Sequence, residues 1–550
     1  MGLVSSLPQY FNARAIPNFQ GIYEQMTDDV NYYKVRAKEV IDGHPTLINP
    51  YIFEHKDGSS VQFWVPDFIL AKPIGWFGLS VSEGFIFWNS ILIPIIILLS
   101  YYLFLLITKS KFWSFLAMIF FYSGIYSTEF LRLPSPGLNF IFFLCALLFV
   151  FLFIREQKNS YAIMSAISFG LLFHIYPWYW TYFIVLFGVF LATSYILKLK
   201  DFSYKKYLYV ILGGLIIGIP YFLSVWRSSQ LPGYGETLAR TGLINTHFPS
   251  GIFSVAVISI IILVSAVFYI KKVIKIDKTS IFVFCCLISG IIATNSHIIT
   301  GKNLEFSSHY LLGNMFVSLL AFVYLLSIYL KDKSEKIKKT FMLLFSICVL
   351  VLMFTGISRL VAQETSSSQN VSYIQNYAPV FDWLNNNAEN DQVVYSNDQI
   401  NSLIPIYTSQ NVYFSPYSLI FLMTNDEVEK RFIISHYFED FTYEYILSKY
   451  RSVFGTFYLN EHAHNRSKNK LRKFFGIAPV SYVEYPSEEI ERIIEKAKLL
   501  QSDSFENQIK TYQVDYLVWD KNKNPDWKLS RFKFLSQVFS EGDIIVYKVN

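Results

Sequence analysis

Residues 85–111 have the sequence FIFWNSILIPIIILLSYYLFLLITKSK, a long apolar stretch that ends in two lysines. The part from 85 to 107 contains no charged side chain and is long enough to cross the hydrocarbon core of a bilayer as one helix. Similar segments recur as far as Ser358, and the chain of 550 residues is 53% hydrophobic with a mean hydropathy of +0.34. This pattern indicates a polytopic α-helical membrane protein rather than a soluble one.

The short loops between the apolar segments alternate in charge. One set is rich in Lys and Arg, and it consists of residues 109–111, 155–158, 198–206, 271–278 and 331–339. The other set carries acids, His, Gly and Pro, with few basic residues. The positive-inside rule places the basic set in the cytoplasm, so the segment before Phe85 and everything after Ser358 are expected outside it. The net charge of +6 therefore indicates topology rather than nucleic-acid binding.

We expect about ten membrane spans, namely residues 85–107, 112–127, 138–154, 160–176, 178–197, 206–226, 251–270, 279–295, 310–330 and 340–357. The expected organisation has four parts. These are a first outer loop with amphipathic surface helices (1–84), a transmembrane domain (85–358), a linker (359–373) and a soluble extracytoplasmic α/β domain (374–550). Because the loop is expected outside, we also expect a first membrane helix to precede it.

Asp28 and Asp29 are the first candidate catalytic residues. They follow Thr27 at the start of a segment, residues 27–42, whose apolar side chains have helical spacing. A carboxylate at the membrane surface can take the proton of an acceptor hydroxyl as a general base. Two adjacent carboxylates can also hold a divalent metal ion, Mg²⁺ or Mn²⁺, that shields a phosphate leaving group. The alternative is that both acids only stabilise the positive end of the helix dipole.

A second set of candidates flanks the spans on the expected outer face. The candidate substrate-binding residues are Glu129, Arg132, Tyr176, Arg227, Lys302 and His309. A cation at this level can bind a lipid phosphate, and Lys302, in a Gly-containing turn between two spans, is the first candidate contact. The alternative for each is ordinary anchoring of a helix end at the interface. The sequence contains no Walker motif, no GxSxG and no HExxH.

Four stretches of the chain are similar to one family. They are TDDVNYY at 27–33, RLPSPG at 132–137, YPWYWT at 176–181, and ITGK at 299–302 followed by His309-Tyr310. With them the chain resembles the GT-C-fold integral membrane glycosyltransferases, particularly a poorly characterised prokaryotic branch. The resemblance implies a polyprenyl-phosphate-linked sugar donor, inverting transfer on the non-cytoplasmic face, and a catalytic Asp that maps to Asp28 or Asp29. In the family a membrane helix precedes this loop, and the resemblance implies one before residue 1 here as well.

We therefore interpret the chain as a multi-pass cell-membrane glycosyltransferase of the cell envelope. It would move a hexosyl group from a polyprenyl-phosphate donor to a glycan, lipid or protein acceptor. The alternatives are a transporter or flippase of lipid-linked sugars, a polysaccharide polymerase or ligase, and a non-catalytic polymer-binding membrane protein. A transporter is disfavoured because mid-span charges are essentially absent and matched half-repeats are not found.

Overall fold

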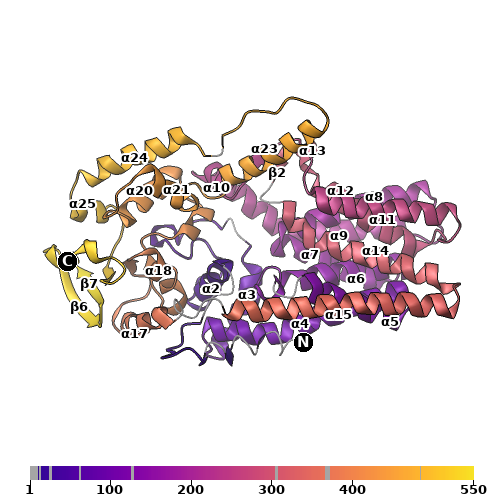
Figure 1. Ribbon diagram of the computed structural model, residues 1–550, viewed down its shortest axis with the longest axis horizontal. Coiled ribbons are helices and arrows are strands. Elements are labelled where there is room, and N and C mark those ends of the chain that lie inside the picture. The colour runs from indigo at the N-terminus through magenta and orange to yellow at the C-terminus, as the bar shows by residue number, and fades with distance from the viewer. Residues whose placement is uncertain are drawn as a thin grey trace.

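The protein has two parts, a bundle of long helices and a mixed α/β part at its C-terminal end (Figure 1). The computed structural model describes residues 6, 10–11, 14–23, 28–60, 63–125, 129–303, 307–365, 372–483 and 485–550. The first loop lies between the two parts, with its helices α2 and α3 at the junction (Figure 1). We call the end of the bundle that meets the C-terminal part the domain side.

Each expected span coincides with a helix. Among the described residues, eight helices are long and apolar enough to cross a membrane. They are α4 (Val81–Thr108), α6 (Asn139–Glu156), α8 (Pro177–Ile196), α9 (Tyr204–Ser229), α11 (Ile252–Ile270), α12 with α13 (Lys278–Thr300), α14 (Leu311–Lys331) and α15 (Glu335–Thr365). The two shorter ones are α7 (Asn159–Ile175) and α5 (Lys111–Ile119), which continues as the π turn η2 (Phe120–Ile125). The expected polytopic helical membrane fold is therefore confirmed.

Several helix boundaries differ from the expected ones, and two of them change the neighbouring segments. Helix α4 begins at Val81 rather than Phe85, because Ser80 caps it. The Ser80 Oγ accepts a bond from the Glu83 N–H and the Glu83 carboxylate accepts one from the Ser80 N–H, each at 3.3 Å, which is a capping box. The last helix of the bundle, α15, runs to Thr365 and so extends into the expected linker, residues 359–373.

The first loop contains the expected helix, α2 (Asp28–Ile41), and a second one, α3 (Val65–Trp76). Thr27, the first residue of the expected helical segment, lies outside the described residues. A buried ion pair joins the two helices, with Arg36 Nη2 2.6 Å from Asp67 Oδ2 and side chains only 6% and 0% exposed. A buried pair of this kind is costly to break, because removing one partner leaves an uncompensated charge. It therefore fixes the orientation of α2 on the domain side.

The C-terminal part contains a five-stranded sheet in the order β4-β3-β5-β7-β6. The strands are β3 (Val393–Tyr395), β4 (Asn411–Val412), β5 (Tyr516–Asp520), β6 (Leu535–Glu541) and β7 (Ile544–Val549). Strand β3 is parallel to β4 and β5, whereas β5, β7 and β6 pair antiparallel. The main helices are α20 (Asn425–Ser435), α23 (Phe457–Phe474) and α24 (Ser487–Gln501).

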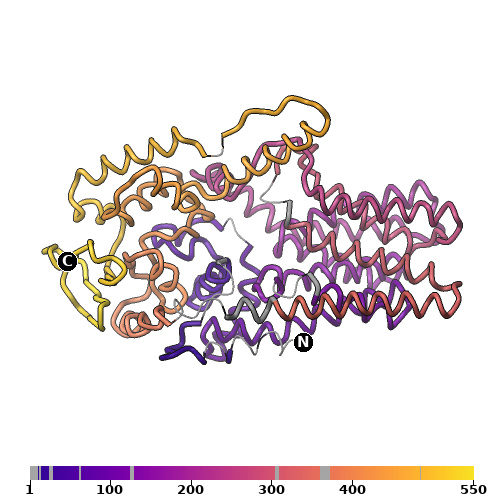
Figure 2. Tube along the Cα trace, viewed as in Figure 1, coloured from indigo at the N-terminus to yellow at the C-terminus, as the bar shows by residue number. Residues whose placement is uncertain are grey.

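The C-terminal part does not build its core alone. Tyr32, Val35 and Tyr51 of the first loop are buried in the same apolar cluster as residues of β3 and α17 (Ala378–Asn387). The Tyr51 carbonyl accepts a bond of 2.9 Å from the Val412 N–H at the edge of the sheet. Figure 2 shows the indigo tube of the first loop beside the orange tube of the C-terminal part. The first loop and the C-terminal part are therefore packed as one body.

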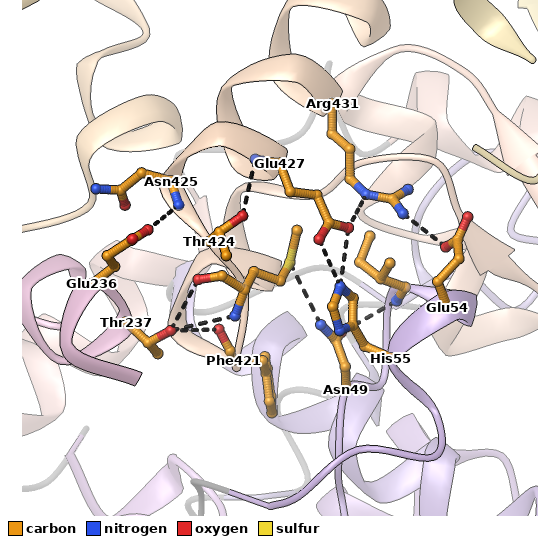
Figure 3. Close-up of polar contacts among 12 residues, drawn as sticks. Asn49, Glu54, His55, Glu236, Thr237, Phe421, Thr424, Asn425, Glu427 and Arg431 are labelled. Atoms are coloured by element: carbon orange, nitrogen blue, oxygen red, sulfur yellow. Dashed lines mark hydrogen bonds and ion pairs between the residues drawn. The ribbon is translucent and has the colours of Figure 1, made fainter. Parts of the chain in front are cut away.

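Charged side chains reinforce this junction (Figure 3). Arg431 on α20 is 1% exposed and lies 2.8 Å from carboxylate oxygens of both Glu54 and Glu427. His55 of the first loop lies 2.9 Å from the other oxygen of Glu427, with its Nε2 facing the carboxylate. These contacts connect the first loop to α20 around the buried guanidinium of Arg431, whose carboxylate partners stay partly exposed.

Helix α10 (Tyr234–Arg240), which follows α9, contacts the same region (Figure 3). Arg240 donates to the Leu419 carbonyl at 3.0 Å and to the Met423 carbonyl at 2.6 Å. Thr237 contacts the carbonyls of residues 421 and 423. Because α10 is joined directly to a span, these bonds hold the C-terminal part over the domain side of the bundle.

Candidate functional site

Arg132 lies at the centre of a charged group on the domain side. It directly follows the short turn η3 (Glu129–Leu131), and its carbonyl accepts a bond of 3.0 Å from the Gly137 N–H. A Cβ atom at Gly137 would lie 2.5 Å from the Leu133 side chain and 2.7 Å from the Phe130 carbonyl oxygen. Only glycine fits this position without a shift of the backbone, so the tight turn fixes where Arg132 stands.

The Arg132 guanidinium joins two carboxylates from different segments. One Nη donates to Asp29 Oδ2 at 2.5 Å and the other to Glu129 Oε2 at 2.9 Å. The Nε of Arg132 is buried and has no hydrogen-bond partner within the described part of the chain. A buried unpaired donor is costly, and an additional anionic oxygen would satisfy it. The two carboxylates are about half exposed, with 52% for Asp29 and 45% for Glu129, so a ligand can reach them.

His309 lies close to Arg132 on the short helix η4 (Ser307–Tyr310). Its ring stacks on Trp178 with centroids 4.0 Å apart, and its Nδ1 contacts the Tyr176 hydroxyl. Burial lowers the pKa of His309 to about 4, and the positive charge of Arg132 adds to this effect. The ring is therefore neutral at pH 7. In the tautomer whose Nδ1 accepts the Tyr176 O–H, the ring proton is on Nε2, which makes Nε2 a donor.

The sequence around Tyr176 explains why this residue meets His309. Pro177 is the first residue of α8, and Tyr176 before it is extended, with φ −164° and ψ 127°. The chain therefore turns sharply between α7 and α8 and presents Tyr176 and Trp178 at the helix ends. Thr181 on α8 and Tyr310 on η4 are hydrogen-bonded through their hydroxyls at 2.7 Å. This bond holds the turn against η4.

We expect the His309→Gln variant to lose less stability than the wild type when the pH is lowered. The pKa of this histidine is about 4 in the folded protein, whereas an ordinary histidine, as in the unfolded chain, has a pKa of about 6.5. Between these values the unfolded chain binds the additional proton, so stability falls as the pH drops through this window and is unaffected above it. Thermal unfolding of the detergent-purified protein at pH 7.5 and pH 4.5 measures the effect.

The matched control for this measurement is His247→Gln, because His247 is an exposed imidazole on the same side of the bundle. The His247→Gln variant should lose as much stability on acidification as the wild type. Equal acid sensitivity of the wild type and His309→Gln would contradict the neutral state of His309.

The structure brings together five of the candidate residues from the sequence, namely Asp29, Glu129, Arg132, Tyr176 and His309. They come from four separate segments. The sequence analysis did not name Trp178 as a site residue, although it stands in the YPWYWT stretch; the signal for it was its place directly after Pro177. We call these five residues with Trp178 the Arg132 site.

Other candidates lie elsewhere or outside the described residues. Arg227 is exposed near the end of α9, and Lys302 is exposed in the two-residue strand β2 (Lys302–Asn303). In the part of the chain that the structure describes, neither side chain has a hydrogen bond or ion pair to the Arg132 site. Asp28 is the first residue of α2, but its side chain is outside the described part. Both cations and Asp28 stay predictions.

The metal ion expected at Asp28 and Asp29 stays a prediction, because the Asp28 side chain is outside the described part and Asp29 is already paired with Arg132. The Asp29 carboxylate lies 2.5 Å from Arg132, so a bound cation would face the guanidinium charge at close range. No group of three or more His, Cys, Asp or Glu side chains is arranged to hold an ion, counting described residues only. The mechanism proposed for the Arg132 site therefore uses side chains of this protein alone.

Comparison with known proteins gives a likeness of structure only. No family model and no curated protein matches the chain. Among solved structures, it is similar to ArnT from Cupriavidus metallidurans in the apo state, with 10% identity and a TM-score of 0.43 over 99% of this chain and 97% of that one. It is also similar to ArnT from the same organism bound to undecaprenyl phosphate, with 10% identity and a TM-score of 0.48 over 99% and 96%.

Proposed function

We propose that this protein is a membrane glycosyltransferase that moves a sugar from a polyprenyl-phosphate-linked donor to an acceptor outside the cytoplasm. The observation that carries the proposal is the arginine of the Arg132 site, whose buried Nε lacks a partner among the described residues and whose other nitrogens bind exposed carboxylates. A guanidinium binds phosphate oxygens in a fixed geometry, and a nearby carboxylate can act as a base. Arg132 lies in the loop before the span α6, at the level where a lipid phosphate would lie, and Asp29 of the first loop is ion-paired to it.

In the proposed mechanism, the donor phosphate replaces Asp29 as a partner of Arg132. The exchange is favourable because a phosphate offers the guanidinium more acceptor oxygens than one carboxylate does. The released Asp29 carboxylate takes the proton of the acceptor hydroxyl while its oxygen attacks the anomeric carbon. The bond from this carbon to the phosphate oxygen breaks, and the polyprenyl phosphate leaves with its charge held by Arg132. Attack opposite the leaving group inverts the anomeric centre.

His309 has a supporting role in this mechanism. In the tautomer whose Nδ1 accepts the Tyr176 O–H, the neutral ring offers the Nε2–H as a donor to the leaving phosphate or to a sugar hydroxyl. Trp178 covers one face of the ring and holds its orientation. A neutral donor suits this position because a second positive charge would be repelled by the nearby guanidinium of Arg132.

A transfer assay tests the proposal. The purified protein is incubated in sealed proteoliposomes with polyprenyl-phosphate-linked hexoses and glycan, lipid or protein acceptors, and the release of free polyprenyl phosphate is measured. We expect release with the wild type and release that is about 10²–10³-fold slower with Arg132→Ala. Arg155→Ala is the matched control, because Arg155 is also ion-paired and lies at the opposite end of α6. Movement of intact donor across the bilayer without release would favour the flippase alternative and contradict the proposal.

We also propose that the domain side lies outside the cytoplasm. The support is that the basic loops 271–278 and 331–339 lie at the end of the bundle away from the C-terminal part (Figure 1). In a variant without native cysteines, Ser502→Cys is expected to react with an impermeant maleimide in intact cells. Thr279→Cys is expected to react only after permeabilisation. The reverse pattern would overturn the topology and the mechanism with it.

A further inference from the structure

Helix α23 has an unusual charge pattern for its place in the fold. Its second half contains five basic residues, Arg466, Lys468, Lys470, Arg472 and Lys473, and it ends in Phe474-Phe475. The sequence from 462 to 483 contains no Asp or Glu. Basic residues are sparse in the other loops on the domain side, so this cluster needs its own physical explanation.

The contacts of α23 place it at the level where two spans end. His464 Nε2 lies 2.7 Å from Thr246 Oγ1, and the Asn460 side chain donates to the Gly242 carbonyl at 3.2 Å. Thr246 is hydrogen-bonded in turn to the Gly301 carbonyl at 2.9 Å. These partners directly precede α11 and follow α13, and Figure 1 shows the helix running toward α13. The ten residues beyond His464 add about 15 Å of helix, which carries its C-terminal end over the edge of the bundle.

The free side of α23 combines charge with large apolar side chains. Asn460 and His464 lie on the attached side, whereas Arg466, Lys470 and Lys473 are exposed and follow one another at spacings of four and three residues. Phe474 is 81% exposed and Phe475 is 69% exposed. The neighbouring span ends also carry exposed apolar residues: Ile299 is 84% exposed and Phe253 is 71% exposed.

We propose that the C-terminal end of α23 rests on the anionic phospholipid headgroups of the domain-side leaflet and anchors the C-terminal part to the bilayer. The basic side chains would bind lipid phosphates, and the two phenylalanines would enter the boundary between headgroups and acyl chains. An acidic polymer would also attract the basic residues. It would not account for exposed aromatic rings at the level of the span ends, so the lipid surface is the occupant that the structure favours. This proposal does not depend on glycosyl transfer.

Site-directed spin labelling of the full chain tests the anchor. A nitroxide is placed at Phe474→Cys, in a variant without the native cysteines, and the protein is reconstituted into nanodiscs. One set contains phosphatidylcholine alone, and the other also contains phosphatidylglycerol. The label at 474 is expected to be accessible to oxygen and protected from a water-soluble nickel chelate, more strongly in the anionic nanodiscs. Leu499→Cys on α24 is the matched control, because Leu499 is 71% exposed and should stay accessible to the chelate.

Charge substitution tests the headgroup contact separately. Arg466→Gln, Lys470→Gln and Lys473→Gln are expected to lower the ratio of protected to unprotected label in anionic nanodiscs by up to about fivefold each. A label at 474 that is as accessible to the chelate as one at 499 in both compositions would overturn the proposal. Equal protection in both compositions would overturn its anionic part. Protection by added polyglutamate but not by phosphatidylglycerol would assign the surface to an acidic polymer instead.

Discussion

Arg132→Ala is expected to lower the rate of sugar transfer by about 10²–10³-fold, the range seen when one preorganised donor to a developing negative charge is removed. The leaving polyprenyl phosphate gains charge as its bond to the sugar breaks, and Arg132 is the proposed group that holds this charge. Steady-state kinetics with varied donor and acceptor measure the loss. We expect a larger effect on kcat/KM for the donor than for the acceptor.

The loss should not come from unfolding. Without Arg132, the carboxylates of Asp29 and Glu129 lose a partner, but both are about half exposed and can be hydrated. Such ion pairs contribute about 0–1 kcal/mol to stability, so thermal unfolding of Arg132→Ala should stay close to that of the wild type. Arg155→Ala provides the same comparison at the other end of α6 and should retain activity. Full activity of Arg132→Ala would show that the phosphate site lies elsewhere.

Arg132→Lys separates charge from geometry. A lysine keeps the positive charge but has a single nitrogen, whereas Arg132 binds Asp29 and Glu129 through two different nitrogens. We expect this variant to recover only part of the lost rate. Recovery of the full rate would mean that the position needs only a point charge.

The membrane fold could be predicted from the sequence because most spans are long apolar segments separated by charged or turn-forming loops. Helix α2 could also be predicted, since its apolar residues have helical spacing. Strand β6 could not, because it is a largely exposed edge strand whose residues alternate poorly between apolar and polar. It is defined by its pairing with β7, which is a contact that local sequence does not contain.

The candidate site was predicted residue by residue but not as a group. Arg132 and His309 stand out in sequence because they are polar residues at span ends, where few other such residues occur. That they meet depends on three-dimensional packing, including the buried pair of Arg36 and Asp67 that orients α2. For the same reason Lys302, which lies in an exposed strand, could not be separated from Arg132 by sequence alone. The membrane contact of helix α23 could not be predicted from the sequence, because polar helices are common on protein surfaces.

Asp29→Asn is expected to lower the transfer rate by about 10²–10⁴-fold, which is the usual loss when a general base is removed. The structure adds a second signature. Because Asp29 and the donor phosphate compete for Arg132 in the proposed mechanism, Asn at this position should bind the donor more tightly while kcat falls. Measuring kcat and donor KM separately therefore distinguishes a base from a residue that only binds substrate.

Asp28→Asn and the double variant complete the experiment, because both acids begin α2. If they only stabilise the helix dipole, each substitution should cost less than about 1 kcal/mol of stability and leave the rate unchanged. If one is the base, the rate falls while thermal unfolding hardly changes, and the double variant is as slow as the more damaging single one. Wild-type rates in all three variants would remove both residues from the mechanism. A slow Asp28→Asn beside an active Asp29→Asn would move the base by one residue, and the ion pair of Asp29 with Arg132 would then be structural.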